Sequence, residues 1–233
     1  MNKLMIIMAT IVFAPGFVFG NTVVIEPGPD IGQDTFASIN DPDANYGDLL
    51  TMGVDCYRRS FLRFTQLDGY IGYEITSAEL EFWYGTSYYS TDAYFCRVLE
   101  PWDEDTLTWN NQPDYSTQGP SQHFPAGESK SNYAVDVTFI VQKWLSGEWV
   151  SYGWCITDGA WYDYLGICTS NYPGVGNGPK LTITGPNLPP VSVQPTSLGK
   201  IKSIYSPQQV SSVKDGRGQF AKHSKREAWA TIM

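Results

Sequence analysis

The sequence predicts an all-β protein: an antiparallel, jelly-roll-like β-sandwich with one short helix, followed by a flexible C-terminal tail. Three observations predict this fold. The 233 residues include 8 Trp, 15 Tyr and 11 Phe with 22 Gly and 15 Pro, which is typical of short strands joined by turns. Many short segments alternate apolar and polar side chains with a period of two. One segment has the three- and four-residue spacing of a helix.

The first segment, residues 1–20, is predicted to be a secretory signal peptide. Lys3 supplies the positive charge, a run of apolar residues follows, and Gly20 is the small residue at its end. A membrane anchor is the alternative, but Pro15 interrupts the run, which is short for a membrane span. We therefore expect a mature chain that begins near Asn21, has no membrane span, and is secreted, extracellular or on the cell surface.

Residues 21–186 are predicted to form one domain of short strands. The clearest strand is 77–85, where Ala78, Leu80 and Phe82 alternate with more polar neighbours and so mark one buried face. Regularly spaced short strands favour a sandwich of two antiparallel sheets. In chain order, we expect strands within residues 21–27, 34–47, where the strand passes into a turn-rich loop, 58–65, 77–85, 92–101, 151–157, 164–170 and 179–185.

One short helix is predicted at Thr138–Leu145. Val137, Ile140 and Trp144 follow one another at steps of three and four residues, which places them on one helical face. Gly147 is expected just past the C-terminus of this helix.

The charge changes sign along the chain. Residues 21–186 contain 7 basic and 22 acidic residues, a net charge of 7 − 22 = −15, whereas residues 187–233 contain 7 basic and 2 acidic residues, a net charge of +5. The acidic part does not fit a nucleic-acid-binding protein and disfavours a polyanionic glycan as ligand. Residues 187–233 are rich in Pro, Gly and Ser and are predicted to be a linker and a largely disordered tail. The positive charge of the tail either keeps it solvated or attaches it to an acidic partner.

The four cysteines are an even set in the oxidising compartment that export implies. Cys155 and Cys168 flank what we interpret as two neighbouring strands and their turn, so we predict that they pair. This leaves Cys56 to pair with Cys96. The alternative is that some or all of them remain buried thiols.

Six segments of the chain occur in an order that resembles the DNRLRE domain, a family grouped with carbohydrate-binding module family 96. The resemblance covers residues 21–185 and is most specific in the fourth segment. The segments are "DTFASINDPDANYGDLLTMG", "RRSFLRF", "ITSAELEFWY", "CRVLEPWDEDTLTWNNQP", "VDVTFIVQKWLSGEWVSYGWCIT" and "PKLTITG".

The resemblance implies a sandwich similar to the propeptide of transforming growth factor, with one short helix. It also implies polysaccharide binding, with alginate among the ligands of the family, often beside lyase, hydrolase or surface-protein domains. Alginate recognition in the family implies a basic groove, but residues 21–186 are strongly acidic here. We therefore transfer none of those contacts and expect a neutral sugar or no sugar.

The segment 96–113 allows three interpretations. Asp103 and Asp105 would share one face of a strand, as the carboxylate pair of a glycosidase requires. The same acids and the asparagines after them offer the hard oxygen ligands that Ca²⁺ prefers. The third interpretation, which we favour, is a structural corner in which Trp102 and Trp109 close the sandwich and the acids accept main-chain N–H bonds.

A second segment with calcium-like spacing lies earlier in the chain. Asp41, Asp43 and Asn45 alternate as at the start of an EF-hand loop, although Tyr46 and Met52 stand where that loop has Gly and Glu. We predict no cofactor and leave open a structural Ca²⁺ at these three residues.

Aromatic side chains are the predicted ligand contacts, because flat rings stack on the C–H faces of sugars. Two aromatic clusters supply the candidates, which are Trp83 and Tyr88 from the first and Trp161 and Tyr162 from the second. The alternative is that these rings only cover the core.

We therefore expect a secreted, non-catalytic module that binds extracellular polysaccharide or the cell envelope. The alternatives are a structural or adhesive surface protein with a protein partner and no glycan, and a polysaccharide-degrading enzyme. The sequence contains no nucleophile motif or phosphate-binding loop that would favour an enzyme.

Overall fold

The computed structural model describes residues 20–27, 32–87, 90–126, 131–158, 164–173 and 178–189. The chain divides into two units, 1–192 and 193–233, and all described residues belong to the first. Residues 1–19 of the predicted signal peptide and the predicted tail beyond residue 189 lie outside the described ranges.

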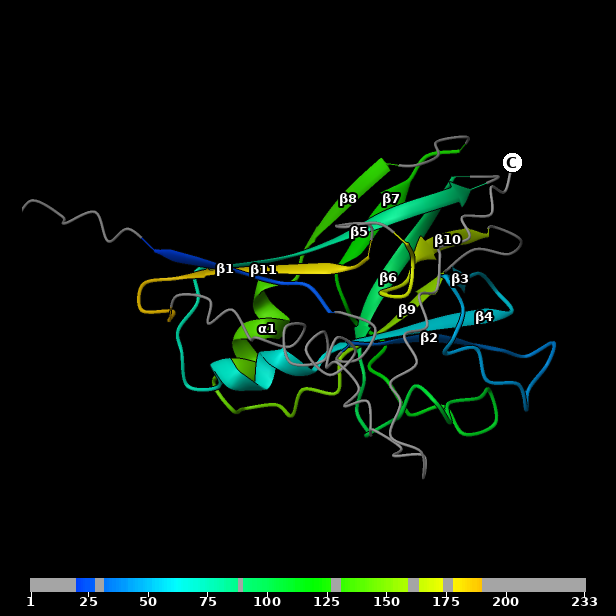
Figure 1. Ribbon diagram of the computed structural model, residues 1–233, viewed down its shortest axis with the longest axis horizontal. Coiled ribbons are helices and arrows are strands. Elements are labelled where there is room, and N and C mark those ends of the chain that lie inside the picture. Colours follow the sequence, from blue (N-terminus) through cyan, green and yellow to red (C-terminus); the bar gives the residue numbers. More distant parts are fainter. Residues whose placement is uncertain are drawn as a thin grey trace, which may run out of the picture. The chain divides into compact units, whose positions relative to one another are not determined.

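The described residues form two antiparallel sheets, which confirms the predicted β-sandwich (Figure 1). Every strand pair within these sheets is antiparallel. The first sheet has the order β1-β11-β5-β10-β3, with β8 also paired to β5, and its strands are β1 (Asn21–Ile25), β3 (Thr51–Val54), β5 (Ser77–Ser87), β8 (Ser131–Asp136), β10 (Leu165–Cys168) and β11 (Lys180–Gly185). The second sheet has the order β2-β4-β9-β6-β7, and its strands are β2 (Gly32–Ser38), β4 (Arg58–Phe64), β6 (Thr91–Arg97), β7 (Ser121–Phe124) and β9 (Trp154–Asp158).

The main core contains the inward-facing side chains of both sheets. Leu80 and Phe82 of β5 are buried, whereas Glu79 is exposed, as the predicted alternation requires. Trp154 of β9 is buried in the same cluster and packs edge-on against Phe64 and Trp144.

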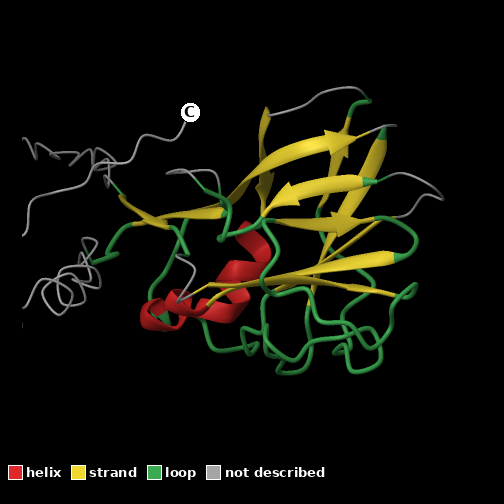
Figure 2. Ribbon diagram, turned by 45° about the vertical axis from the view of Figure 1, so that its right-hand side comes forward, coloured by secondary structure: helices red, strands yellow, loops and turns green. Residues whose placement is uncertain are grey.

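Two short helices lie together at one end of the sandwich (Figure 2). The α-helix α1 spans Thr138–Leu145, which are the predicted bounds. Its apolar face is buried, and Gly147 follows its C-cap with φ 75°, as predicted. The second helix is the 3₁₀ helix η1 (Thr65–Tyr70), which the sequence did not predict. No helix within the described ranges is long and apolar enough to cross a membrane.

A second, smaller core lies on the outer side of β4 and β9. Phe61 of β4 and Cys155 of β9 are buried in it together with Trp102 and Leu107 of the segment 96–113. Since their strand neighbours Leu62 and Trp154 face the main core, both strands are covered on both faces. This explains why Ser60, Phe61 and Leu62 are all fully buried.

The four cysteines are free thiols in the structure, so the predicted disulfides, Cys155 with Cys168 and Cys56 with Cys96, are not present. The physical reason is the sheet topology. β9 and β10 belong to different sheets, and Cys155 faces the second core, away from the sheet that carries Cys168. Its register partner on β6 is Cys96.

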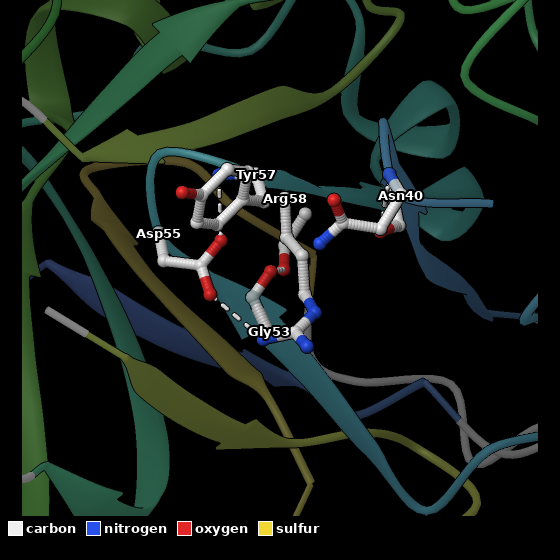
Figure 3. A network of polar contacts seen from close by, with 7 residues as sticks. Asn40, Gly53, Asp55, Tyr57 and Arg58 are labelled. Carbon is white, nitrogen blue, oxygen red and sulfur yellow. Dashed lines mark hydrogen bonds and ion pairs between the residues drawn. The ribbon is translucent and has the colours of Figure 1, made fainter. Parts of the chain in front are cut away.

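A tight turn carries the chain from β3 in one sheet to β4 in the other (Figure 3). The Asp55 carboxylate accepts the Tyr57 N–H at 2.8 Å and forms an ion pair with the Arg58 guanidinium at 2.7 Å. The Ser60 hydroxyl donates to the Gly53 carbonyl at 2.9 Å, which ties the second strand back to the first. These contacts hold the two sheets together at this edge of the sandwich.

Candidate functional site

A hollow in the surface lies beside α1. Its volume is about 690 Å³, which is within the usual range for a small-molecule site. The walls come from the end of β6, the loop before β7, the end of β8, the first turns of α1 and the loop after α1. Its lining residues include Arg97, Gln118, Asp136, Phe139, Gln142 and Trp149. We call this hollow the α1 pocket.

Two aromatic rings and one cation form the central wall of the α1 pocket. The Arg97 guanidinium lies over the Trp149 ring, 4.1 Å from its centroid, and the Phe139 ring meets Trp149 edge-on at 5.7 Å. Phe139 is 62% exposed, an unusual position for a large apolar side chain on an ordered helix. The pocket therefore offers an exposed ring beside a guanidinium that the neighbouring indole holds in place.

The local fold explains why Phe139 points outward. Ile140, Val141 and Trp144 form the buried face of α1, and Phe139 lies outside that face. The helix begins where the Asp136 carboxylate accepts the Thr138 N–H at 2.9 Å, and this bond fixes the first turn against the end of β8.

The loop before β7 supplies another part of the wall, next to Arg97. The Ser116 hydroxyl accepts the Arg97 N–H at 3.0 Å, and the Arg97 carbonyl accepts the Ser116 N–H at 2.8 Å. At Gly119 a Cβ would lie 2.1 Å from the Phe95 carbonyl oxygen, so only glycine allows the loop to approach β6 this closely. These contacts place Gln118 and Pro120 at the edge of the pocket.

The charges in and beside the pocket are balanced. Arg97 faces the same hollow as Asp136, and Lys143 next to the pocket pairs with Glu148. Hydrogen bonds from Thr138 lower the pKa of Asp136, so this carboxyl remains ionised at neutral pH. An ionised Asp136 accepts hydrogen bonds and does not act as an acid.

A second, smaller hollow of about 310 Å³ shares Trp149 with the α1 pocket. Arg63, Trp144 and Val150 are among its other lining residues. Trp149 thus separates two adjacent depressions, an arrangement that suits a ligand longer than one ring.

The segment 96–113 forms a corner over the second core. Trp102 is buried, and its indole N–H donates to the Tyr152 carbonyl at 2.8 Å. The Arg59 guanidinium lies 4.4 Å from the centroid of the Trp109 ring and donates to the Gln112 amide oxygen at 2.9 Å. Asp103 caps a turn by accepting the main-chain N–H of residue 105 at 3.0 Å. These contacts support the structural interpretation of this segment.

A comparison with family models gives a match over residues 30–185, to carbohydrate-binding module family 96. The chain belongs to this family. The comparison with curated proteins found no match. The family match ends at the residue where β11 ends, so it covers the strands of the sandwich from β2 onward.

Of the four aromatic residues predicted to bind sugar in this family 96 module, the structure describes one, Trp83. Trp83 lies on β5, half-buried, beside Asn132 of β8. Tyr88, Trp161 and Tyr162 fall outside the described ranges. Their role in binding stays a prediction.

The predicted calcium ligands lie in the loop between β2 and β3, and the structure shows structural partners for two of them. The Asn45 amide donates to the carbonyls of Glu104 and Leu107, and Asp43 accepts the Asn110 amide at 2.8 Å. The described residues hold no group of three or more His, Cys, Asp or Glu side chains arranged for a metal. Calcium at Asp41, Asp43 and Asn45 stays a prediction.

Sequence reasoning missed the residues of the α1 pocket. Phe139 was the available signal, because a large apolar residue off the buried stripe of a helix needs a reason to be exposed. Arg97 and Trp149 are 52 positions apart (149 − 97), so no local pattern links them.

Proposed function

We propose that this family 96 member is an exported, non-catalytic module that binds neutral polysaccharide, in the extracellular space or at the cell envelope, through the α1 pocket. One observation carries the proposal: an exposed Phe139 and a stacked Arg97–Trp149 pair line the same hollow. In a carbohydrate-binding family, an exposed ring beside fixed polar groups is the arrangement that sugar recognition requires.

The chemistry of the pocket suits a pyranose ring. The C–H face of a sugar packs on the exposed Phe139 ring, while its hydroxyls donate to the ionised Asp136 and accept from Arg97. The Gln118 and Gln142 amides line the same hollow, although Gln142 already donates to the Ile75 carbonyl at 3.1 Å. Trp149 would then act mainly by holding Arg97 in position.

A neutral polysaccharide fits the charges better than an anionic one. The α1 pocket has one guanidinium and one carboxylate in its lining, so it provides no net attraction for a uronate. The surrounding domain carries a net charge of −15 over residues 21–186, which repels polyanions at long range. We expect binding to a neutral chain to be insensitive to 0.5 M NaCl within about twofold, because screening affects only net charge interactions.

The positions of the acids support a non-catalytic role. Asp103 and Asp105 lie in a turn and not on a strand, so they do not share a strand face as a glycosidase pair. Glu104 has a raised pKa, but the acid beside it, Asp34, is fully buried and out of reach of a substrate. Release of reducing ends from any polysaccharide by the purified chain would instead support the enzyme alternative.

The test is retention of the purified full chain in gels or on beads that contain neutral or anionic polysaccharides. Phe139→Ala and Trp149→Ala are expected to reduce affinity for the retained neutral polysaccharide at least tenfold. Tyr94→Ala is the matched control, because Tyr94 is a 40% exposed aromatic on β6 outside the α1 pocket. Circular dichroism must show that every variant is folded.

The same assay compares the pocket with the aromatic residues predicted from the sequence. If Trp83→Ala and Trp161→Ala abolish retention and Phe139→Ala does not, the binding face is the sequence-predicted one and the α1 pocket is wrong. If no polysaccharide is retained at all, a protein partner becomes the better candidate. That alternative has its own support in Ile71 and Val150, which are 57% and 62% exposed beside Trp149.

A further inference from the structure

A buried carboxylate lies at the free edge of the second sheet, on β2. Asp34 is fully buried, although β2 is an edge strand. Its Oδ2 accepts the Ser170 N–H at 2.7 Å, and its Oδ1 has no hydrogen-bond partner among the described residues. An unpaired carboxylate oxygen in the interior is costly, and such groups need a partner or an ion.

A second carboxylate reaches the same place from the corner segment. The main-chain N–H of Asp34 is one of the groups that act on the Glu104 carboxylate, and it lowers the pKa of this carboxyl. Gly47 passes so close that a Cβ there would lie 2.9 Å from Glu104 Cγ. The Glu104 side chain is therefore half-buried and lies against Gly47 of the loop between β2 and β3.

Three loops are tied together around these two acids. The Asn45 amide donates to the Glu104 carbonyl at 2.7 Å and joins the first loop to the corner segment. The third loop, which follows β10, donates from Thr169 to the Leu49 carbonyl at 2.8 Å and from Asn171 to the Gly47 carbonyl at 3.1 Å. These three bonds tie the loops around the two acids to one another without using a carboxylate oxygen.

The negative charge at this place has no positive partner among the groups that act on it. Burial and the charges of Asp34, Asp105 and Asp48 raise the pKa of Glu104 to about 7. Burial likewise raises the pKa of Asp34 to about 6, although hydrogen bonds from Ser170 oppose the shift. At neutral pH the site would have to hold either a proton or a cation.

We propose that Asp34 and Glu104 bind a structural Ca²⁺ that holds the three loops together. Two carboxylates are hard oxygen ligands, and Ca²⁺ accepts main-chain carbonyls and water for its remaining positions in irregular geometry. Mg²⁺ fits less well, because it demands near-octahedral geometry at shorter distances. This site differs from the calcium site predicted at Asp41, Asp43 and Asn45, although Gly47 of the same loop lies against the Glu104 side chain. The calcium proposal does not depend on the proposal that the protein binds sugar.

The experiment measures the melting temperature of the full chain after chelation, and then during titration with CaCl₂, with MgCl₂, and with NaCl at matched ionic strength. We expect a saturable rise with Ca²⁺, a smaller one with Mg²⁺, and one Ca²⁺ per chain by isothermal titration calorimetry. No heat and no melting shift at 1 mM Ca²⁺, about a physiological extracellular level for modules of this kind, would overturn the proposal.

The variants Glu104→Gln and Asp34→Asn test whether the two acids bind a cation or have only a structural role. Each keeps the shape of the side chain and removes a charge, so each should raise the melting temperature of the chelated protein and weaken Ca²⁺ binding at least tenfold. Glu79→Gln, an exposed acid on β5, is the control that should keep the full response. Asp43→Asn should also keep it, and loss of Ca²⁺ binding in Asp43→Asn alone would place the ion at the sequence-predicted loop instead. A response to Ca²⁺ that survives Glu104→Gln and Asp34→Asn would also refute the proposal.

Discussion

Asn45 shows how one side chain can fasten two distant loops. Its amide nitrogen donates to the carbonyls of Glu104 and Leu107 at 2.7 and 2.9 Å, and its Oδ1 accepts the Gly47 N–H at 3.2 Å. The two carbonyls are 59 and 62 residues away in the sequence. The spacing of Asp41, Asp43 and Asn45 therefore could not reveal this role, because it depends on partners that only the tertiary fold supplies.

Asn45→Ala is expected to lower the free energy of unfolding by about 1–3 kcal/mol, because it leaves two carbonyls without their donor. The measurement is chemical denaturation followed by tryptophan fluorescence. Asn110→Ala is the matched control, since the Asn110 amide makes one exposed bond to Asp43. Its expected cost is within about 0.5 kcal/mol. Equal losses in the two variants would contradict the role assigned to Asn45.

The four thiols should differ in reactivity according to burial. Cys96, Cys155 and Cys168 are buried, and burial raises the pKa of each, whereas Cys56 lies half-buried in the turn after β3. A maleimide at pH 7.5 should label Cys56 in the native protein and all four cysteines after denaturation. Mass spectrometry reads the number of labels. If the unreduced, denatured protein takes up no maleimide, then all four cysteines are in disulfides.

At the scale of the element, the connection into β9 depends on one glycine. Gly153 has φ 84°, and a Cβ there would lie 2.2 Å from the Leu62 carbonyl oxygen. Gly147, after α1, has a similar φ of 75°, but a Cβ there would meet nothing within 4 Å. An alanine at Gly147 would therefore introduce backbone strain alone, whereas an alanine at Gly153 would introduce both strain and a steric clash.

Gly147→Ala is expected to cost about 1 kcal/mol, the strain of a left-handed alanine. Gly153→Ala should cost about 3 kcal/mol or more, because the same strain is joined by a clash with β4, which neither strand can relieve without breaking its pairing. Urea denaturation of both variants measures the difference. A loss at Gly153→Ala no larger than that at Gly147→Ala would show that β9 can shift away from Leu62.

The elements that were predictable from the sequence are those whose pattern is local. The helix Thr138–Leu145 and the strand β5 were correctly placed, because each buries one face and exposes the other. β3, β7 and β8 were missed. β3 and β7 have only four residues each, too few to establish a period of two, and β8 ends two residues before α1, so the helical spacing hid it. The α1 pocket was missed for a related reason: its walls come from four stretches of the chain that are separated in sequence.

At the scale of the whole molecule, the acidic charge of the domain bears on its stability. The excess of acidic residues gives residues 21–186 a net charge of −15, and ionised acids in a compact state repel one another. Most of these acids are on the surface and well solvated, so their repulsion is weak. Asp34 and Glu104 are less exposed, and their pKa values rise to about 6 and about 7 from ordinary values of 3.8 and 4.5.

An acid whose pKa is higher in the folded than in the unfolded chain keeps its proton after the unfolded chain has lost it. Folding then takes up protons, so the free energy of unfolding falls as pH rises between the two pKa values, here from about pH 4 to about pH 7. Asp48 and Asp105 act on Glu104, and Ser170 acts on Asp34. None of these three residues is changed in the variants of Asp34 and Glu104.

We therefore expect the chelated protein to lose stability across this range relative to the double variant Asp34→Asn, Glu104→Gln, in which neither group titrates. The measurement is urea denaturation of both proteins at pH 4.5, 5.5, 6.5 and 7.5 in chelator, with the difference in free energy plotted against pH. The difference should favour the variant increasingly up to about pH 7 and then level off, because both carboxyls are ionised above that point. A difference that is flat, or that favours the wild type at high pH, would mean that a cationic group or a tightly held ion already neutralises the pair.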